Sequence, residues 1–160
     1  MGDPLGNPER LIRAVYAYVA YRIGPGVDAD DVTSDVFERA LRYRDSFDPN
    51  RGTPTAWLIG IARHRLNGER DPTAVSLDDA PELTAPTDLE GDVVRKLSLG
   101  DALSHLGDRD RELIALRYGA DLSARDIAEV LSLTPNAVDV ALHRAVERLR
   151  ETLDRDELAR

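Results

Sequence analysis

Apolar residues recur at steps of three and four along most of the chain, which is the spacing of one face of an α-helix. The clearest case spans Ser123–Leu149, where a few residues separate two such segments. Ser123 and Thr134 are typical N-caps, and Pro135 suits a first helical position because its missing N–H costs nothing there. The inward positions are Ile127, Ala128, Val130 and Leu131, then Val138, Leu142, Ala145 and Leu149. The pattern predicts a helix-turn-helix, although an ordinary helical hairpin has the same spacing.

The second of these helices leaves a largely polar face uncovered. In a helix-turn-helix that binds DNA, the second helix enters the major groove and its outward side chains contact the base edges. The residues that the spacing turns outward or to the flank are Asn136, Ala137, Asp139, Val140, His143, Arg144, Glu147 and Arg148.

Three more amphipathic segments precede residue 70, so the chain is predicted to be all-α. The first helix begins at Asn7–Pro8 and ends before Gly24–Pro25, the second has Asp28 as its expected N-cap, and the third begins at Thr53–Pro54. Their inward residues are Leu11, Ile12, Val15, Val19 and Ile23; Val32, Val36, Phe37 and Ala40; and Ala56, Trp57, Leu58, Ile61, Ala62 and Leu66.

The third helix has a basic end, formed by Arg63, His64, Arg65 and Arg70. Cations are favourable at a helix C-terminus, and this explanation is preferred over a nucleic-acid contact from these residues alone. Trp57 is likewise interpreted as a core residue before it is considered as a platform for a base.

Charge divides the chain into parts. The formal net charge is −9, and residues 71–92 contain seven acidic side chains, no basic one and several prolines. Such a composition cannot form a core and is typical of a solvated spacer. We therefore expect an N-terminal domain over residues 1–70, an acidic flexible linker over 71–92 and a C-terminal helix-turn-helix domain over 93–160.

Several classes of function find no support in the sequence. The absence of cysteine excludes disulfides, thiol catalysis and cysteine-based zinc fingers. His64, His105 and His143 lack metal-ligand spacing, and no catalytic triad or phosphate-binding loop is present. We expect no enzymatic activity, no cofactor and no metal site. The first residues, MGDPLGNPERL, lack signal-peptide features and no apolar run is long enough to cross a membrane, so a cytoplasmic protein is expected.

Three segments carry a resemblance to a known family. The segments are DADDVTSDVFERAL (28–41), TPTAWLIGIARH (53–64) and LGDRDRELIALRY (106–118), and the last one leads into SARDIAEVL and LHRAVERLR. Together they strongly resemble bacterial sigma factors of the extracytoplasmic-function (ECF) type of the sigma-70 family. The resemblance covers nearly all of residues 10–153. It implies two helical domains, one that binds core RNA polymerase and the near promoter element and one that binds the distant element.

The resemblance also implies roles for individual residues. It places the polymerase contact on the outer face of 28–44, at Asp31, Asp35, Glu38, Arg39 and Arg42. It places the near-element contacts at Asn50, Arg51, Arg63, His64 and Arg65. It assigns the distant element to Arg125, Thr134, Asn136, Asp139, Val140, His143, Arg144 and Arg148. The implied partners are core RNA polymerase, promoter DNA and a cognate anti-sigma factor, without membrane insertion; the linker acids Asp78, Asp79, Glu82, Asp88, Glu90 and Asp92 are expected near basic polymerase surface.

The recognition helix departs from the family pattern T-V-K-S-R-L-H-R-A. Asp139 stands where lysine is common, Val140 replaces serine and Ala141 replaces arginine. An aspartate near phosphates lowers affinity, whereas it can accept a hydrogen bond from cytosine, and valine can contact a thymine methyl. Asp139 supports one alternative, an adaptor that binds polymerase or another regulator without binding promoter DNA. A second alternative is a free-standing helix-turn-helix regulator, which shares the C-terminal helix-turn-helix but leaves residues 28–64 unexplained.

Overall fold

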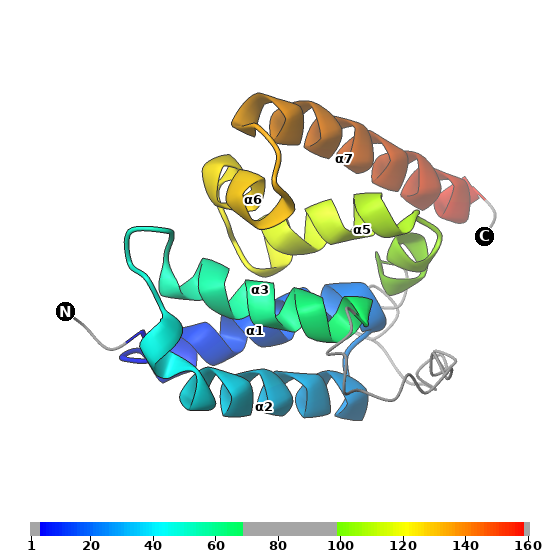
Figure 1. Ribbon diagram of the computed structural model, residues 1–160. Coiled ribbons are helices and arrows are strands. Elements are labelled where there is room, and N and C mark those ends of the chain that lie inside the picture. The colour runs from blue at the N-terminus through cyan, green and yellow to red at the C-terminus, as the bar shows by residue number, and fades with distance from the viewer. Residues whose placement is uncertain (1–3, 69–98, 159–160) are drawn as a thin grey trace.

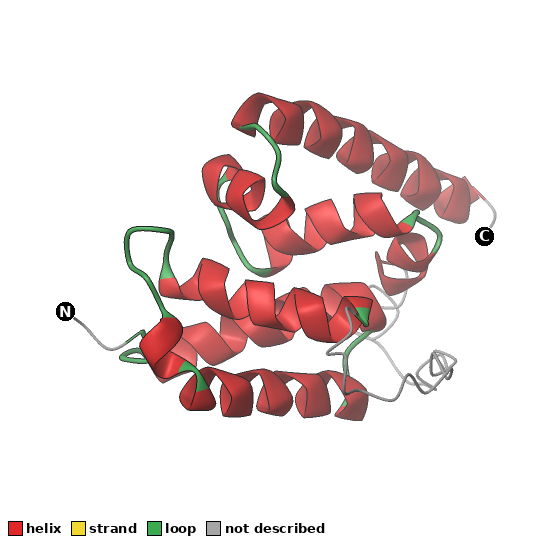
Figure 2. Ribbon diagram, in the orientation of Figure 1, coloured by secondary structure: helices red, strands yellow, loops and turns green. Residues whose placement is uncertain are grey.

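The computed structural model describes residues 4–68 and 99–158, and all of their regular structure is helical (Figure 2). The all-α prediction is therefore confirmed, whereas the expected linker 71–92 and its acidic residues lie outside the described ranges. A helical segment over 99–104 precedes the second half. The labelled elements are α1 (Pro8–Ile23), α2 (Val27–Arg42), the 3₁₀ turn η1 (Arg44–Ser46), α3 (Pro54–Asn67), α5 (Asp108–Ile114), the π-helical turn η2 (Ala115–Gly119), α6 (Ala124–Leu131) and α7 (Pro135–Leu158).

Three helices begin at hydroxyl caps that the sequence predicts. The side chains of Thr53, Ser123 and Thr134 each accept a hydrogen bond of 3.1 Å from the backbone N–H three residues later. Each bond satisfies one of the N–H groups that a helix start leaves unpaired. The starts of α3, α6 and α7 are therefore fixed locally.

The prediction that Asp28 caps the second helix is wrong. Helix α2 begins at Val27, and its N-cap is Gly26, whose φ of 128° suits glycine alone. Asp28 lies inside the first turn instead, where its carboxylate still favours the positive end of the helix dipole. Asn7 does occupy the N-cap of α1, but its side chain makes no capping bond.

Helices α6 and α7 form the predicted helix-turn-helix. Ser132 adopts the left-handed conformation, with φ of 57°, and the N–H of Leu133 donates to the carbonyl of Ala128 at 2.9 Å. Ala128 and Val138 are both buried between the two helices, as the spacing requires. The turn therefore holds α7 at a fixed angle across α6.

The two halves of the chain pack against each other in two helical layers (Figure 1). Helices α1, α2 and α3 form one layer, and α5, α6 and α7 form the other, with α1 in contact with η2. One continuous cluster of buried residues includes Val15 and Tyr18 from the first layer and Leu113 and Leu116 from the second. The sequence predicts two domains but contains no sign of this shared core.

We expect Leu116→Ala to destabilise the whole protein, because Leu116 is fully buried in the shared core. Loss of a buried leucine side chain costs about 2–5 kcal/mol of unfolding free energy. Leu41→Ala is the matched control, since Leu41 is 56% exposed and its truncation should change stability by less than about 0.5 kcal/mol. Urea denaturation followed by circular dichroism measures both, and equal stability of the two variants would contradict the shared core.

Candidate nucleic-acid and polymerase interfaces

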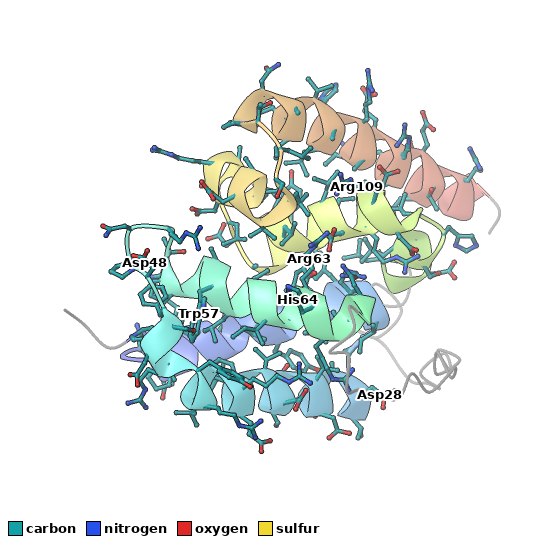
Figure 3. All side chains as sticks on the ribbon, in the orientation of Figure 1. Asp28, Asp48, Trp57, Arg63, His64 and Arg109 are labelled. Atoms are coloured by element: carbon teal, nitrogen blue, oxygen red, sulfur yellow. The ribbon has the colours of Figure 1, made fainter. Side chains whose placement is uncertain are left out.

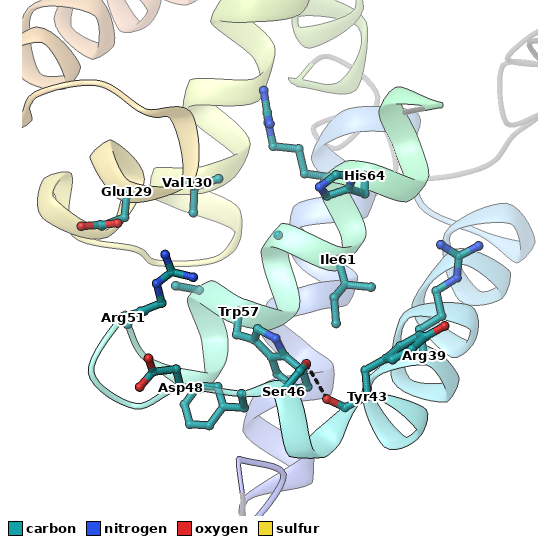
Figure 4. Close-up of a pocket in the computed structure, with 15 residues that line it drawn as sticks. Arg39, Tyr43, Ser46, Asp48, Arg51, Trp57, Ile61, His64, Glu129 and Val130 are labelled. Carbon is teal, nitrogen blue, oxygen red and sulfur yellow. Dashed lines mark hydrogen bonds between the residues drawn. The ribbon is translucent and has the colours of Figure 1, made fainter. Parts of the chain in front are cut away.

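A groove of about 910 Å³ lies where the two layers meet (Figure 4). Its floor and rim come from the end of α2, residues 46–52 and α3, and its other wall comes from α6. Trp57 and Ile61 supply apolar surface, whereas Arg51 and His64 supply basic or polar groups. A surface of this composition suits a nucleic-acid strand, whose bases stack on aromatic rings and whose phosphates need cations.

The aromatic part of the groove is a pair of rings. Phe47 and Trp57 contact edge to face, with ring centroids 5.5 Å apart and an angle of 60° between the planes. Trp57 also packs against the hydrophobic core, as the sequence predicts, while it lines the groove. Both rings are half-buried, which leaves ring surface available in the groove.

The five near-element residues do not share one environment. Arg51, Arg63 and His64 line the groove, whereas Asn50 and Arg65 do not. The backbone N–H of Asn50 donates to Asp48 Oδ1 at 2.9 Å, which shapes the loop before α3. Arg65 Nε donates to Asp35 Oδ2 at 3.0 Å and so links α3 to α2.

Arg63 belongs to a buried polar group that we call the Glu112 cluster, formed by Tyr18, Arg22, Arg63 and Glu112. Glu112 is in α5 and its side chain is 7% exposed. Its Oε2 atom accepts from Arg63 Nε at 2.9 Å, from Arg22 Nη1 at 3.3 Å and from the Tyr18 hydroxyl at 3.3 Å. Figure 3 shows Arg63 extending from α3 toward α5. The carboxylate of the second layer is thus held by three donors of the first.

Two further contacts complete the Glu112 cluster. Arg22 Nη1 also donates to the Tyr18 hydroxyl at 2.9 Å, and Arg22 Nη2 donates to Asn67 Oδ1 at 3.0 Å. Burial raises the pKa of Tyr18 to about 12, against the opposing effect of the Arg22 charge. The phenol therefore remains protonated at neutral pH and is available as a donor to Glu112.

The predicted polymerase-binding residues lie along α2. Asp31, Glu38 and Arg42 are exposed, and Arg42 Nη2 lies 3.9 Å from Glu38 Oε1. Asp35 is only half-exposed because it pairs with Arg39 at 3.3 Å as well as with Arg65. Leu41 and Tyr43, each 56% exposed, add apolar surface near the end of the same helix. The face offers charge and apolar area together, as protein interfaces do.

Some of the helix-turn-helix residues that the resemblance assigns to DNA are exposed, whereas others make contacts within the protein. Arg144 is exposed and makes no ion pair within the described parts of the chain, whereas His143 Nε2 lies 3.3 Å from Glu147 Oε1. Thr134 caps α7, and Arg148 Nη1 contacts both carboxylate oxygens of Asp110 at 2.8 and 2.9 Å. The other exposed members are Arg125, Asn136, Asp139 and Val140.

Sequence reasoning missed Arg22, Tyr18 and Glu112 as members of one group. Glu112 is 90 residues from Arg22 and 49 residues from Arg63 along the chain, so no local spacing connects them. The four-residue step between Tyr18 and Arg22 on α1 is the one local signal, and it identifies a helix face without its partner.

Within the described residues, no helix has the length and apolar content needed to cross a membrane. The same residues contain no group of three or more His, Cys, Asp or Glu side chains arranged to hold a metal ion.

Both halves of the chain match established families. Residues 9–67 match Sigma-70 region 2, and residues 96–149 match Sigma-70, region 4. The chain is similar to the solved structure of CnrH in complex with the cytosolic domain of CnrY, with a TM-score of 0.64, 27% identity, and coverage of 93% of this chain and 83% of that one. It also shares its fold with RpoE in complex with the anti-sigma factor NepR from Bartonella quintana, with a TM-score of 0.65, 23% identity, and coverage of 90% and 92%.

Curated relatives give the same result. The ECF RNA polymerase sigma factor SigD of Mycobacterium tuberculosis is 33% identical over 167 residues, which cover 91% of this chain and 74% of SigD. The ECF RNA polymerase sigma factor BldN of Streptomyces coelicolor is 31% identical over 150 residues, which cover 89% of this chain and 57% of BldN. The chain therefore belongs to the ECF RNA polymerase sigma factors of the sigma-70 family, which direct RNA polymerase to promoters.

Proposed function

We propose that this sigma factor binds core RNA polymerase through α2, the near promoter element through the groove beside α3, and the distant element through α7. The observation that carries the proposal is the groove, which combines the Phe47–Trp57 ring pair with Arg51 and Arg63. Stacking surface beside guanidinium groups is what a single strand with unstacked bases requires. Because polymerase and the chromosome are in the cytoplasm, we propose that the protein acts there.

The outer face of α2 supports the polymerase contact. Asp31, Glu38 and Arg42 are exposed beside the apolar side chains of Leu41 and Tyr43. Acidic residues on this face oppose a contact with phosphates and favour a basic protein surface. Asp35, Arg39 and Arg65 act indirectly in this proposal, because Arg65 of α3 pairs with Asp35 of α2 and Arg39 pairs with the same carboxylate within α2.

The outer face of α7 supports a weak but selective DNA contact. Arg144 is the strongest candidate for a base or phosphate, and Asp139 and Val140 add an acceptor and an apolar side chain. This face carries few cations, so its own affinity for DNA is low. Tethering to polymerase raises the effective concentration of α7 at the promoter, which compensates for that low affinity.

Control by a protein partner is a further part of the proposal. The similar structures of CnrH and RpoE are complexes with CnrY and with the anti-sigma factor NepR, respectively. We propose that an anti-sigma factor binds this chain as well.

Transcription in vitro with purified core polymerase on genomic fragments tests the proposal as a whole. We expect initiation at defined promoters that depends on this protein. Polymerase binding without such initiation would favour the adaptor, and DNA binding without any polymerase contact would favour a free-standing regulator.

We expect Arg144→Ala to reduce promoter use, since Arg144 is exposed on the recognition helix. The loss should correspond to about 1–3 kcal/mol if the guanidinium contacts a base edge. Arg150→Ala is the matched control, because Arg150 is exposed on α7 beyond the helix-turn-helix. Run-off transcription on a template with the native distant element measures both variants. Equal promoter use by Arg144→Ala and the wild type would remove Arg144 from the DNA contacts.

We expect reversal of charge on α2, in the double variant Asp31→Arg and Glu38→Arg, to weaken binding to core polymerase. Repulsion from a basic partner surface should lower the affinity by on the order of tenfold. Asp154→Arg is the control, because it also replaces an acidic side chain by a basic one, at an exposed position on α7 instead of α2. Competition for core polymerase against a fluorescent wild-type protein measures the affinities. Unchanged affinity of the double variant would place the polymerase contact elsewhere.

A further inference from the structure

We infer that the described arrangement is a closed state, in which the Glu112 carboxylate occupies a phosphate-binding position formed by Arg22, Arg63 and Tyr18. In the open state, which polymerase and promoter DNA stabilise, a DNA phosphate takes this position. The inference rests on the proposed function, because it requires the surface around Arg63 to face promoter DNA.

The Glu112 cluster has the chemistry of an anion site. Three donors from α1 and α3 converge on one carboxylate oxygen, at 2.9, 3.3 and 3.3 Å. Two guanidinium groups face a single carboxylate, so a net positive charge remains on the first layer. Arginine and tyrosine are side chains that commonly contact phosphate oxygens in protein–DNA interfaces. A phosphodiester therefore suits these donors at least as well as Glu112 does.

The second layer also restricts the groove in which Arg63 lies. Glu129 and Val130 of α6 line that groove, and Figure 4 shows Glu129 on α6 above the loop that carries Arg51. An exposed carboxylate at this place repels the phosphates of an incoming strand. Two acidic residues of the C-terminal domain, Glu112 and Glu129, thus oppose DNA binding by the N-terminal domain.

The contact between the layers depends on a close backbone approach at Gly119. A Cβ atom at Gly119 would lie 3.0 Å from the carbonyl oxygen of Ala17 and 3.1 Å from the Cα of Tyr18. Both neighbours are backbone atoms of α1, which cannot rotate away. The φ of Gly119 is outside the left-handed region, so alanine is tolerated by the local backbone and its methyl group acts mainly on the interface.

The first experiment measures closure in the full-length protein. The chain has no cysteine, so Asp48→Cys and Glu129→Cys provide two specific sites for fluorescent dyes, both exposed and both on the groove. Energy transfer between the dyes should be high in the parent protein and lower in Gly119→Ala and in Glu112→Gln. Gly100→Ala is the matched control, because a Cβ there meets no atom within 4 Å. Unchanged transfer in both Gly119→Ala and Glu112→Gln would overturn the closed state.

The second experiment measures the phosphate site, with a fluorescent single-stranded DNA of mixed sequence and proteins without dyes. Glu112→Gln and Gly119→Ala should bind this DNA at least several-fold more tightly than the wild type. The plot of log affinity against log salt should steepen by about 0.7 for each phosphate gained. Adding Arg63→Ala to Glu112→Gln should remove the gain. Reduced energy transfer without tighter DNA binding would overturn the phosphate site.

Circular dichroism distinguishes separation of the two layers from unfolding of the protein. If Gly119→Ala does not fold, Glu112→Gln still tests the inference, because it adds no methyl group to the interface. Arg63→Ala in the holoenzyme separates this inference from the proposed function. Weaker near-element use by Arg63→Ala, together with unchanged energy transfer in both Gly119→Ala and Glu112→Gln, overturns the closed state alone. Normal near-element use by Arg63→Ala overturns the assignment of Arg63 to promoter DNA, on which the inference rests.

Discussion

The buried carboxylate of Glu112 is the constraint on which the relative placement of the two layers depends. A charge that is removed from water must be paired and hydrogen-bonded, or its burial is strongly unfavourable. All three of its side-chain donors belong to the other layer. The apolar contacts of the shared core, which includes Leu116 and residues of α1, are not directional and allow neighbouring registers. The Glu112 cluster selects one of them.

The ion pairs of the described residues add to the effect of the net charge of −9, because they occupy arginines that would otherwise be available to DNA phosphates. Several arginines that a sequence assigns to DNA are partnered within the protein, such as Arg65 with Asp35 and Arg148 with Asp110. These pairs join α3 to α2 and α7 to α5, so their basic groups hold helices in place. The proposed function therefore assigns much of the affinity for the promoter to the polymerase, because few exposed cations remain on the described part of α7.

The parts of the structure that could be predicted from the sequence are those determined over three or four residues. Ser123 and Thr134 mark their helices correctly because a cap bond joins positions three apart. Asp28 fails as a cap because Gly26 adopts a backbone conformation that begins the helix earlier, and composition alone does not show that choice. The resemblance names Arg63 as a near-element contact, which stays a prediction, whereas its partner Glu112 lies 49 residues away and could not be found from spacing.

The outer face of α7 carries two exposed residues that do not suit phosphate contacts. Asp139 and Val140 leave α7 with a carboxylate and an apolar side chain, groups that suit cytosine N4 and the thymine methyl but not phosphates. In the proposed function, this helix contributes discrimination between sequences more than it contributes binding energy. Such a division is workable only when another surface holds the protein on DNA, because a free-standing reader needs phosphate contacts to remain bound. In the proposed function, the acidic side chain on α7 and the dependence on polymerase are therefore two consequences of the same distribution of charge.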